Sequence, residues 1–457
     1  MKQKKFESCS MSPRHFIPQA TMWSFAGLIL FAGFVRADDW PGWMGPRQDG
    51  SWNETGLVET IPSEGLKVKW RVPVGLGYSG PAVAGSRVFL SDFQKETGES
   101  TNDFNSRAQI KGTERLICFD SQTGKLLWQY AYPEEYKISY SAGPRATPTI
   151  QGDKVYHLGA EGHLACLETA TGKLVWKSDL KKDLGSTTPL WGFCSHPFVH
   201  EGHVYLMAGP SDGALVCLDQ ATGKLKWKAL PTKEPGYAPV VLHQGKSGPE
   251  LLAYHPEAVA SVSPKTGAVN WQVPLTPQYA MSIAGPRVAG DVVFASGIGD
   301  TGVAFEITKG ESGKPIVKEL WRQTNKTGVP SANSTPLLVK GVIYGCDCQT
   351  GAFRAVDLRT GNRLWESFLP TTGNRRGAHG TAFIAKAGDL FYLFSETGHL
   401  VLMKPNPEEY IELGRFKVLE PTNESFGRPV VWSHPAFAQK AMFARNDKEL
   451  VRVELAK

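Results

Sequence analysis

One short phrase, repeated at long intervals, constrains this chain more than any other feature. It consists of an acidic residue, three residues, a glycine, three more residues and a tryptophan. The complete copies place these three residues at Asp120, Gly124 and Trp128; Glu168, Gly172 and Trp176; Asp219, Gly223 and Trp227; and Asp357, Gly361 and Trp365. Another copy has Ser263 in place of the acid, followed by Gly267 and Trp271, and two degenerate copies end at Trp321 and Phe416.

The spacing of the aromatic residues predicts the architecture. With Trp70 added at the front, successive aromatic positions are separated by 58, 48, 51, 44, 50, 44 and 51 residues. A strand-rich repeat of about 40–50 residues is typical of a β-propeller with four strands per blade. Eight aromatic positions predict eight blades, and 13 Trp and 22 Phe residues suit a β-rich core. We therefore predict an all-β fold, an eight-bladed β-propeller.

The phrase itself has a structural explanation. The acid can accept hydrogen bonds from the turn's own amides, and the glycine can take the left-handed conformation of a short hairpin. The tryptophan falls on the outermost strand, where it can lie across the neighbouring blade. A phosphate-binding function for Thr-Gly-Lys is disfavoured, because a P-loop needs GxxxxGK[ST] between a strand and a helix.

The chain ends predict how the ring closes. Trp70 is not preceded by the other three strands of a blade, whereas the segment from Trp432 to Lys457 supplies three strands and lacks the fourth. We expect the N-terminal strand to complete the last blade, which removes the open edge of the ring. The predicted organisation is a leader segment at 38–65 and the propeller at 66–457.

Residues 1–37 have the layout of a secretory signal peptide, with basic residues before a 14-residue apolar run, Met22–Val35, and small residues near Ala37. The run is short for a bilayer span, so the uncleaved anchor is the alternative and no transmembrane span is expected after cleavage. Cleavage lowers the net charge from +6 to +2, because five basic residues and one acidic residue are removed. We predict a periplasmic or secreted protein that does not bind nucleic acid.

The repeated phrases resemble the tryptophan-docking motifs of the pyrroloquinoline quinone (PQQ) repeat family, over about residues 66–457. The resemblance implies an eight-bladed propeller, either of the PQQ-dependent dehydrogenase type or of the cofactor-free type that includes BamB-like assembly scaffolds. The dehydrogenases have a vicinal Cys-Cys pair against the quinone, a bound calcium and an aspartate base. This chain has only Cys346-Asp347-Cys348 and no motif that matches the calcium and base residues. We therefore assign no cofactor, and PQQ with Ca²⁺ stays an alternative.

Candidate ligand-binding residues lie in the turns before the innermost strands, where the repeats differ from one another. These turns are expected to cluster on one face of the ring, as a funnel. The candidates are Arg145, Trp191, His196, Tyr237, Asn333, Arg375, Arg376, His379, Trp432 and His434. Such a set suits an anionic or carbohydrate-like ligand, and the alternative is that it fills the channel mouth.

Other features have simpler explanations. Cys118, Cys166 and Cys217 occupy one repeat position and are expected to be packing residues. His196 and His434 lie three blades apart, so a shared metal is not expected. The polar stretch 91–115 is expected to be a mobile loop. Trp40 and Trp43 either face a ligand or pin the leader to the propeller.

The sequence thus favours an exported, non-catalytic propeller that binds a protein, a polymer or a small ligand through its funnel face. The catalytic residues are unknown, and no metal site is assigned. The alternatives are a PQQ-dependent alcohol or sugar dehydrogenase with a divergent site, and a hydrolase or lyase acting on polysaccharide.

Overall fold

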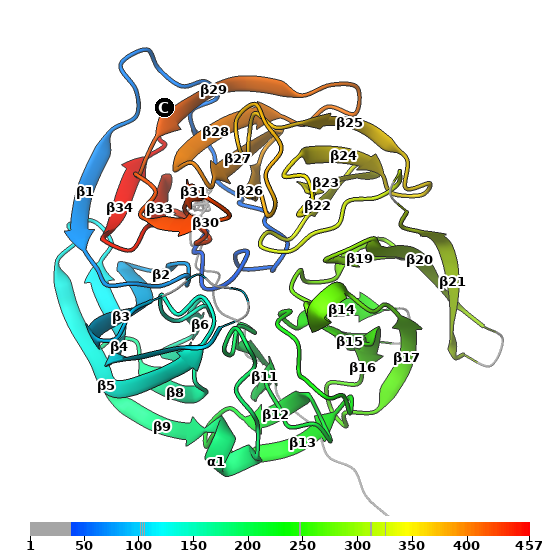
Figure 1. The fold of residues 1–457 in the computed structure, drawn as a ribbon, viewed down its shortest axis with the longest axis horizontal. Coiled ribbons are helices and arrows are strands. Elements are labelled where there is room, and N and C mark those ends of the chain that lie inside the picture. Colours follow the sequence, from blue (N-terminus) through cyan, green and yellow to red (C-terminus); the bar gives the residue numbers. More distant parts are fainter. Residues whose placement is uncertain are drawn as a thin grey trace, which may run out of the picture. The chain divides into compact units, whose positions relative to one another are not determined.

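Eight four-stranded antiparallel sheets make up the chain in a computed structural model, confirming the predicted β-propeller. The structure describes residues 38–100, 102, 104, 106–245, 248–310, 313–324 and 326–457. The predicted signal peptide, 1–37, lies outside the described residues. Residues 37–457 form one compact unit, and its sheets are arranged radially around a centre (Figure 1).

Each blade runs from an innermost strand at the centre to an outermost strand at the rim (Figure 1). The innermost strands are β2 (Ala82–Ala84), β6 (Thr149–Gln151), β10 (Phe198–His200), β14 (Val241–Gly245), β18 (Arg287–Ala289), β22 (Leu337–Val339), β26 (Ala382–Ala387) and β32 (Ala436–Ala438). The second strands are β3 (Arg87–Thr97), β7 (Lys154–Leu158), β11 (His203–Met207), β15 (Gly248–His255), β19 (Val292–Gly297), β23 (Val342–Cys346), β27 (Leu390–Ser395) and β33 (Ala441–Arg445).

The third strands are β4 (Ala108–Asp120), β8 (His163–Glu168), β12 (Leu215–Asp219), β16 (Ala258–Val262), β20 (Thr301–Lys309), β24 (Phe353–Asp357), β28 (His399–Lys404) and β34 (Glu449–Glu454). The outermost strands are β5 (Leu126–Ile138), β9 (Leu174–Asp179), β13 (Leu225–Ala229), β17 (Val269–Pro274), β21 (Pro315–Arg322), β25 (Arg363–Ser367), β29 (Ile411–Lys417) and β1 (Val68–Pro73). The remaining elements are the ribbon β30 (Asn423–Ser425) and β31 (Arg428–Val430), helix α1 (Leu180–Leu184) and the 3₁₀ turn η1 (Gln278–Ala280). No helix among the described residues is long and apolar enough to cross a membrane.

The last blade is closed by the N-terminal and C-terminal strands of the described chain, as predicted. Strand β1 pairs antiparallel with β34, with Trp70 opposite Arg452 and Pro73 opposite Glu449. The order of this sheet is β1-β34-β33-β32, so the N-terminal strand is the outermost strand of a blade whose other three strands are C-terminal.

The core lies between neighbouring blades. Strands β16 and β23 are buried along their whole length, because a sheet covers each of their faces. The outermost strands alternate between covered and exposed residues, as β1 and β25 do. Doubly covered inner strands explain why the sequence shows apolar runs there in place of strict alternation.

The repeated phrase forms the turn between the third and outermost strands. The carboxylate of Asp120 accepts hydrogen bonds from the amides of Gln122 and Thr123 at 3.0 and 2.8 Å. Gly124 has φ +71°, in the left-handed region. The side-chain hydrogen bond from Thr123 is the main cause that lowers the pKa of Asp120 below its ordinary value. The acid and the glycine therefore both serve the turn.

The tryptophans contact the turns of the next blade. The indole N–H of Trp128 donates to the carbonyl of Thr169 at 3.0 Å, and its ring lies on Gly172, where a Cβ would come within 2.5 Å of it. The same ring-to-glycine contact joins Trp70 to Gly124, Trp176 to Gly223, Trp227 to Gly267 and Trp321 to Gly361. Trp271 instead meets Phe305 edge-on at 5.3 Å, and Trp365 donates to the carbonyl of Asn406.

The expectation of a mobile loop at 91–115 is wrong for the parts that form strands, 91–97 and 108–115. Strands β3 and β4 extend into this stretch as a paired ribbon, with Phe93 opposite Glu114. Some of its charged side chains are exposed, such as Lys95 and Lys111, but others are paired inside the protein. Asp92 is fully buried beside Arg115, whose Nε–H donates to it at 2.8 Å. Glu114 is fully buried as well, and accepts a hydrogen bond from Tyr132 at 2.6 Å.

Candidate functional site

A cavity of about 190 Å³ opens at the funnel end of the central channel, where the connections into the innermost strands converge. It is lined by Trp43, Tyr78, Phe104, Tyr140, Arg145, Trp191, Cys194, His196, Tyr237, Pro239, Met281, Ile283, Ala332, Asn333, Thr335, His379, Phe426, Trp432 and His434. Eight of the ten residues that the sequence nominated are in this set: Arg145, Trp191, His196, Tyr237, Asn333, His379, Trp432 and His434.

The other two nominated residues lie elsewhere. Arg375 and Arg376 are exposed on the connection between β25 and β26, and neither lines the funnel cavity. Arg376 lines a separate cavity between blades. This connection is longer than those of most other blades, so only its last part, with His379, reaches the channel.

The floor of the cavity is a group of three rings. The rings of His196 and His434 meet edge-on at 6.1 Å, although their strands are three blades apart. The central channel is narrow, so two side chains from blades three positions apart around the propeller can still meet across it. Trp43 stacks on the other side of His196, with ring centroids 5.5 Å apart.

Both floor histidines are held in the neutral form. Burial lowers the pKa of His434 to about 3. Burial, and then the neighbouring His434, lower the pKa of His196 well below its ordinary value. The Nδ1 atom of His196 accepts the backbone N–H of Thr147 at 2.8 Å, so the ring's remaining proton is on Nε2. Within the described residues, no group of three His, Cys, Asp or Glu side chains is placed to hold a metal ion.

The leader closes the channel at the end opposite the funnel. Trp40 pairs with Val83 of β2 through two backbone hydrogen bonds, and Asp39 accepts from Gly85 in the turn after β2. Because each innermost strand begins at the funnel, the turn that follows it lies at the far end. Trp40 and Trp43 are both buried. The leader therefore packs into the propeller, and its Trp43 also forms part of the cavity floor.

Aromatic rings form the walls. Trp191 lies 5.4 Å from Phe104 and 5.4 Å from Tyr237, measured between ring centroids. On the other side, His379 stacks on Phe426 at 4.9 Å with an interplanar angle of 8°. Phe426 was not expected from the sequence, because it lies in the turn between β30 and β31, which has no counterpart in the other blades.

Several wall residues have strained backbones. Tyr140, His379 and Phe426 have φ values of 50°, 57° and 51°, and Tyr279, beside Phe104 at the rim, has φ 58°. The left-handed region disfavours side chains with a Cβ, and strained residues of this kind cluster at binding sites. The concentration of such residues around one cavity supports a binding role for it.

The charged groups near the cavity are already engaged. The guanidinium of Arg145 donates to the carbonyl of Ser139 at 2.9 Å and lies 5.2 Å from the ring centre of Tyr78. Glu396 does not line the cavity: it is buried behind Trp432, whose indole N–H donates to it at 3.2 Å, and it is paired with Arg428. None of the described residues that line the cavity is an Asp or a Glu.

The cysteines are separate thiols. The six described cysteines are free, and Cys118, Cys166 and Cys217 are buried. Cys194 lines the cavity, and burial raises the pKa of its thiol to about 11. Cys346 and Cys348 lie outside the lining.

The eight radial blades and the cavity at the mouth of their channel define the class of the protein as a β-propeller of the PQQ-repeat type. The model of a family described as outer membrane protein assembly factor BamB matches residues 112–367, more than half of the chain, and the chain belongs to this family.

The curated relatives are matched over part of their length. The BamB of Yersinia pestis is 26% identical over 266 residues, which are 56% of this chain and 63% of the relative. Tetrathionate hydrolase of Acidithiobacillus ferrooxidans is 23% identical over 312 residues, 61% of this chain and 56% of that protein. The chain thus spans less than two thirds of the length of these relatives.

Two solved structures share the fold. BamB from Moraxella catarrhalis superposes with a TM-score of 0.54 at 14% identity, covering 85% of this chain and 97% of that one. Quinohemoprotein alcohol dehydrogenase from Comamonas testosteroni gives 0.56 at 13% identity, covering 93% and 82%. At these identities the likeness concerns the fold alone, and one fold can carry different functions.

Proposed function

We propose that this chain is an exported, non-catalytic propeller that binds a partner through its funnel, by taking an apolar or aromatic group of that partner into the mouth cavity. The observation that carries the proposal is the composition of the lining: rings from opposite sides of the channel and, among the described residues, one charged side chain, Arg145. Binding cavities typically combine such an apolar lining with a few fixed polar groups.

The size of the cavity supports a small insert. Since a water molecule occupies about 30 Å³ in the liquid, about 190 Å³ holds roughly six waters. This is room for one large side chain or a small planar molecule, and aromatic anchors of this kind dominate many protein interfaces. The leader closes the other end of the channel, so we infer that the partner enters from the funnel side.

A protein partner is favoured by the family. Three curated relatives are named outer membrane protein assembly factor BamB, and the chain belongs to the family of that description. A periplasmic or secreted location agrees with such a role, and it rests on the predicted signal peptide.

The chemistry of the lining argues against catalysis. Burial lowers the pKa of His434 to about 3, so at neutral pH this ring is neither a charged acid nor an effective base. The thiol of Cys194 stays protonated at neutral pH, because burial raises its pKa to about 11. Glu396, which accepts the indole N–H of Trp432, is already paired with Arg428 at 2.7 Å and is 1% exposed.

The residues present do not fit PQQ with calcium. Calcium binds oxygen ligands and usually carboxylates, and no carboxylate lines the described part of the cavity. The quinoprotein Cys-Cys pair has no equivalent in this lining, which contains the single thiol of Cys194. We therefore place the dehydrogenase alternative second.

Selection from a displayed library of random peptides tests the proposal. We expect residues 38–457 to enrich peptides with an aromatic or large aliphatic anchor, and Phe426→Ala to weaken their binding about tenfold. Leu369→Ala is the matched control, because Leu369 is 47% exposed and outside the lining, while Phe426 is 50% exposed and inside it. Selected peptides that bind both variants as tightly as the wild type would contradict the proposal.

Reconstitution tests the second candidate. The protein is incubated with PQQ and Ca²⁺, and thermal unfolding and dye-linked oxidation of alcohols and sugars are measured. We expect no saturable stabilisation and no oxidation. A saturable rise in Tm together with turnover would establish the dehydrogenase and overturn the non-catalytic assignment.

A further inference from the structure

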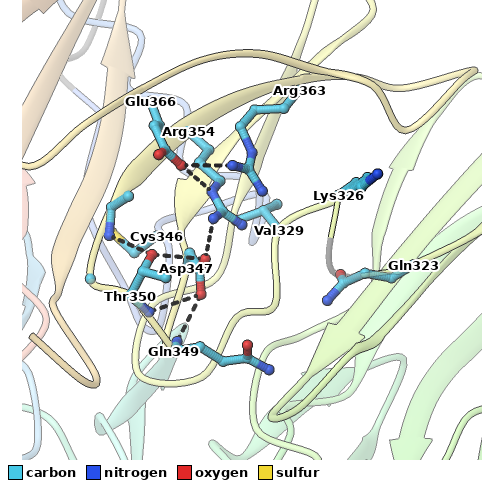
Figure 2. Close-up of polar contacts among 12 residues, drawn as sticks. Gln323, Lys326, Val329, Cys346, Asp347, Gln349, Thr350, Arg354, Arg363 and Glu366 are labelled. Atoms are coloured by element: carbon cyan, nitrogen blue, oxygen red, sulfur yellow. Dashed lines mark hydrogen bonds and ion pairs between the residues drawn. The ribbon is translucent and has the colours of Figure 1, made fainter. Parts of the chain in front are cut away.

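A second cavity lies between the fifth blade (β18–β21) and the sixth blade (β22–β25), and the function proposed above does not use it. Its volume is about 410 Å³, within the range of about 300–1,000 Å³ typical of small-molecule sites. Its polar wall combines residues from the β21–β22 and β23–β24 connections with residues from strand β25 (Figure 2). The lining residues are Asp300, Gln323, Thr324, Pro330, Asp347, Gln349, Thr350, Arg354, Arg363, Glu366, Phe368 and Arg376.

The deepest acid of this wall, Asp347, is fixed. It is 2% exposed and accepts the backbone N–H of Gln349 at 2.7 Å and the hydroxyl of Thr350 at 2.8 Å. It also forms an ion pair with Arg354 at 2.5 Å. Figure 2 shows these contacts gathered around the turn that follows β23.

A second acid holds two guanidinium groups side by side. One oxygen of Glu366 accepts from Nε of Arg354 at 3.1 Å and from Nη1 of Arg363 at 3.0 Å (Figure 2). The chain Asp347–Arg354–Glu366–Arg363 therefore alternates in charge, and each member is positioned before any ligand arrives. The remaining N–H groups of the two arginines and the second oxygen of Glu366 have no partner among the described residues.

The outer part of the cavity adds groups that are not engaged within the described structure. Arg376 and Gln349 are exposed, and their side chains form no hydrogen bond or ion pair with a described residue. Asp300 is likewise unpaired, and Phe368 contributes a half-buried ring. The lining holds three arginines and three acidic residues, so its formal charge is zero.

A neutral wall of neighbouring, fixed donors and acceptors suits a particular ligand chemistry. A hydroxyl group both donates and accepts, whereas a carboxylate or phosphate only accepts and an ammonium group only donates. Vicinal hydroxyls can therefore bond to guanidinium N–H groups and carboxylate oxygens at once, and the apolar face of a sugar ring can lie on an aromatic ring such as Phe368. We propose that this inter-blade cavity binds a sugar, as a free monosaccharide or as one unit of a glycan.

The proposed sugar site is independent of the funnel proposal, but the two cavities share a border. The connection between β25 and β26 contributes Phe368 and Arg376 to the sugar site and His379 to the funnel cavity. A glycan held by the sugar site would thus lie beside the mouth of the funnel.

Saturation-transfer NMR on residues 38–457 tests the proposal. The probes are glucose, galactose, mannose and N-acetylglucosamine, each also as its oligosaccharide, and malonate and methyl phosphate serve as anionic probes. We expect saturable transfer to at least one sugar and none to the anions. Tighter binding of an oligosaccharide than of its monosaccharide indicates a glycan source, and equal binding indicates a free sugar.

Neighbouring arginines give a matched pair of variants. Arg376→Gln should raise the Kd of the bound sugar about tenfold, because a charged hydrogen-bond donor is lost, and Gln349→Ala should raise it by a smaller factor. Arg375→Gln removes the same charge from an exposed residue outside the lining and should leave the Kd unchanged. The proposal is overturned by absence of saturable sugar binding, by sugar binding that Arg376→Gln and Arg375→Gln affect equally, or by a site that takes only the anions.

Discussion

The contact between Trp128 and Gly172 can be tested by adding a single methyl group. In Gly172→Ala the new Cβ would lie 2.5 Å from the indole ring of the preceding blade, and the residue would keep φ +70°. Gly152 provides the control, since it has φ +61° and nothing within 4 Å of the position of its Cβ. Both variants incur the cost of the left-handed conformation, about 1 kcal/mol, but only Gly172→Ala must also displace a tryptophan.

The expected difference follows from the cost of overpacking, which is about 1–3 kcal/mol. We expect Gly152→Ala to lower the free energy of unfolding by about 1 kcal/mol and Gly172→Ala to lower it by about 2–4 kcal/mol. Urea unfolding, followed by circular dichroism, measures both. In a Trp128→Ala background the extra loss should disappear, because the ring that the methyl group meets is gone. Equal losses in the two single variants, or an extra loss that survives in that background, would refute the steric explanation.

Three further predictions concern buried groups. The pKa of His434 is about 3 in the folded protein and about 6.5 in the unfolded chain, so protonation of the unfolded chain lowers the free energy of unfolding by about 2 kcal/mol as the pH falls from above 6.5 to 5. In His434→Gln, the free energy of unfolding in urea should therefore depend less on pH between 7 and 5. An unchanged pH dependence would contradict this argument. Trp43→Ala should lower the stability by about 3–5 kcal/mol, because Trp43 is 4% exposed, and a Tm within 2 °C of the wild type (on the order of 0.5 kcal/mol) would show that the leader does not support the channel. Glu396→Gln should lower the free energy of unfolding by about 3–5 kcal/mol, because it leaves the charge of Arg428 without its partner. Glu420→Gln breaks an exposed ion pair with Lys417 and should lower it by less than about 1 kcal/mol. Similar losses in the two variants would refute the argument from burial.

The fold was predictable because its signal is local and repeated. Each complete copy of the acid, glycine and tryptophan phrase specifies one turn, and the eight aromatic positions, Trp70 included, give the number of blades. Ring closure followed from a single strand at the N-terminal end and three strands at the C-terminal end, which together make one blade, and β1 does pair with β34. Sequence alone failed at 91–115, because charged residues such as Asp92 and Arg115 that neutralise one another inside the protein look like residues of a solvated loop.

The candidate site was predictable in position and less so in content. The segments before the innermost strands identified most of the residues that line the mouth cavity. The floor of the cavity could not be predicted, because the number of blades does not say how wide the channel is, and the contact between His196 and His434 depends on that width. Phe426 comes from a segment outside the repeat, so no equivalent position in another blade drew attention to it, whereas Trp43 was singled out as a residue that either faces a ligand or pins the leader.

The pairing of β1 with β34 has a consequence for how the protein is made. Arg71 and Glu449, which form an ion pair across this seam, are 378 residues apart in the chain. The first strand to be synthesised therefore waits for nearly the whole chain before its partner exists. Until then the ring is an open arc with an unpaired strand edge at each end, a state prone to wrong pairing with other chains. Deletion of either terminal strand is therefore expected to damage the same blade.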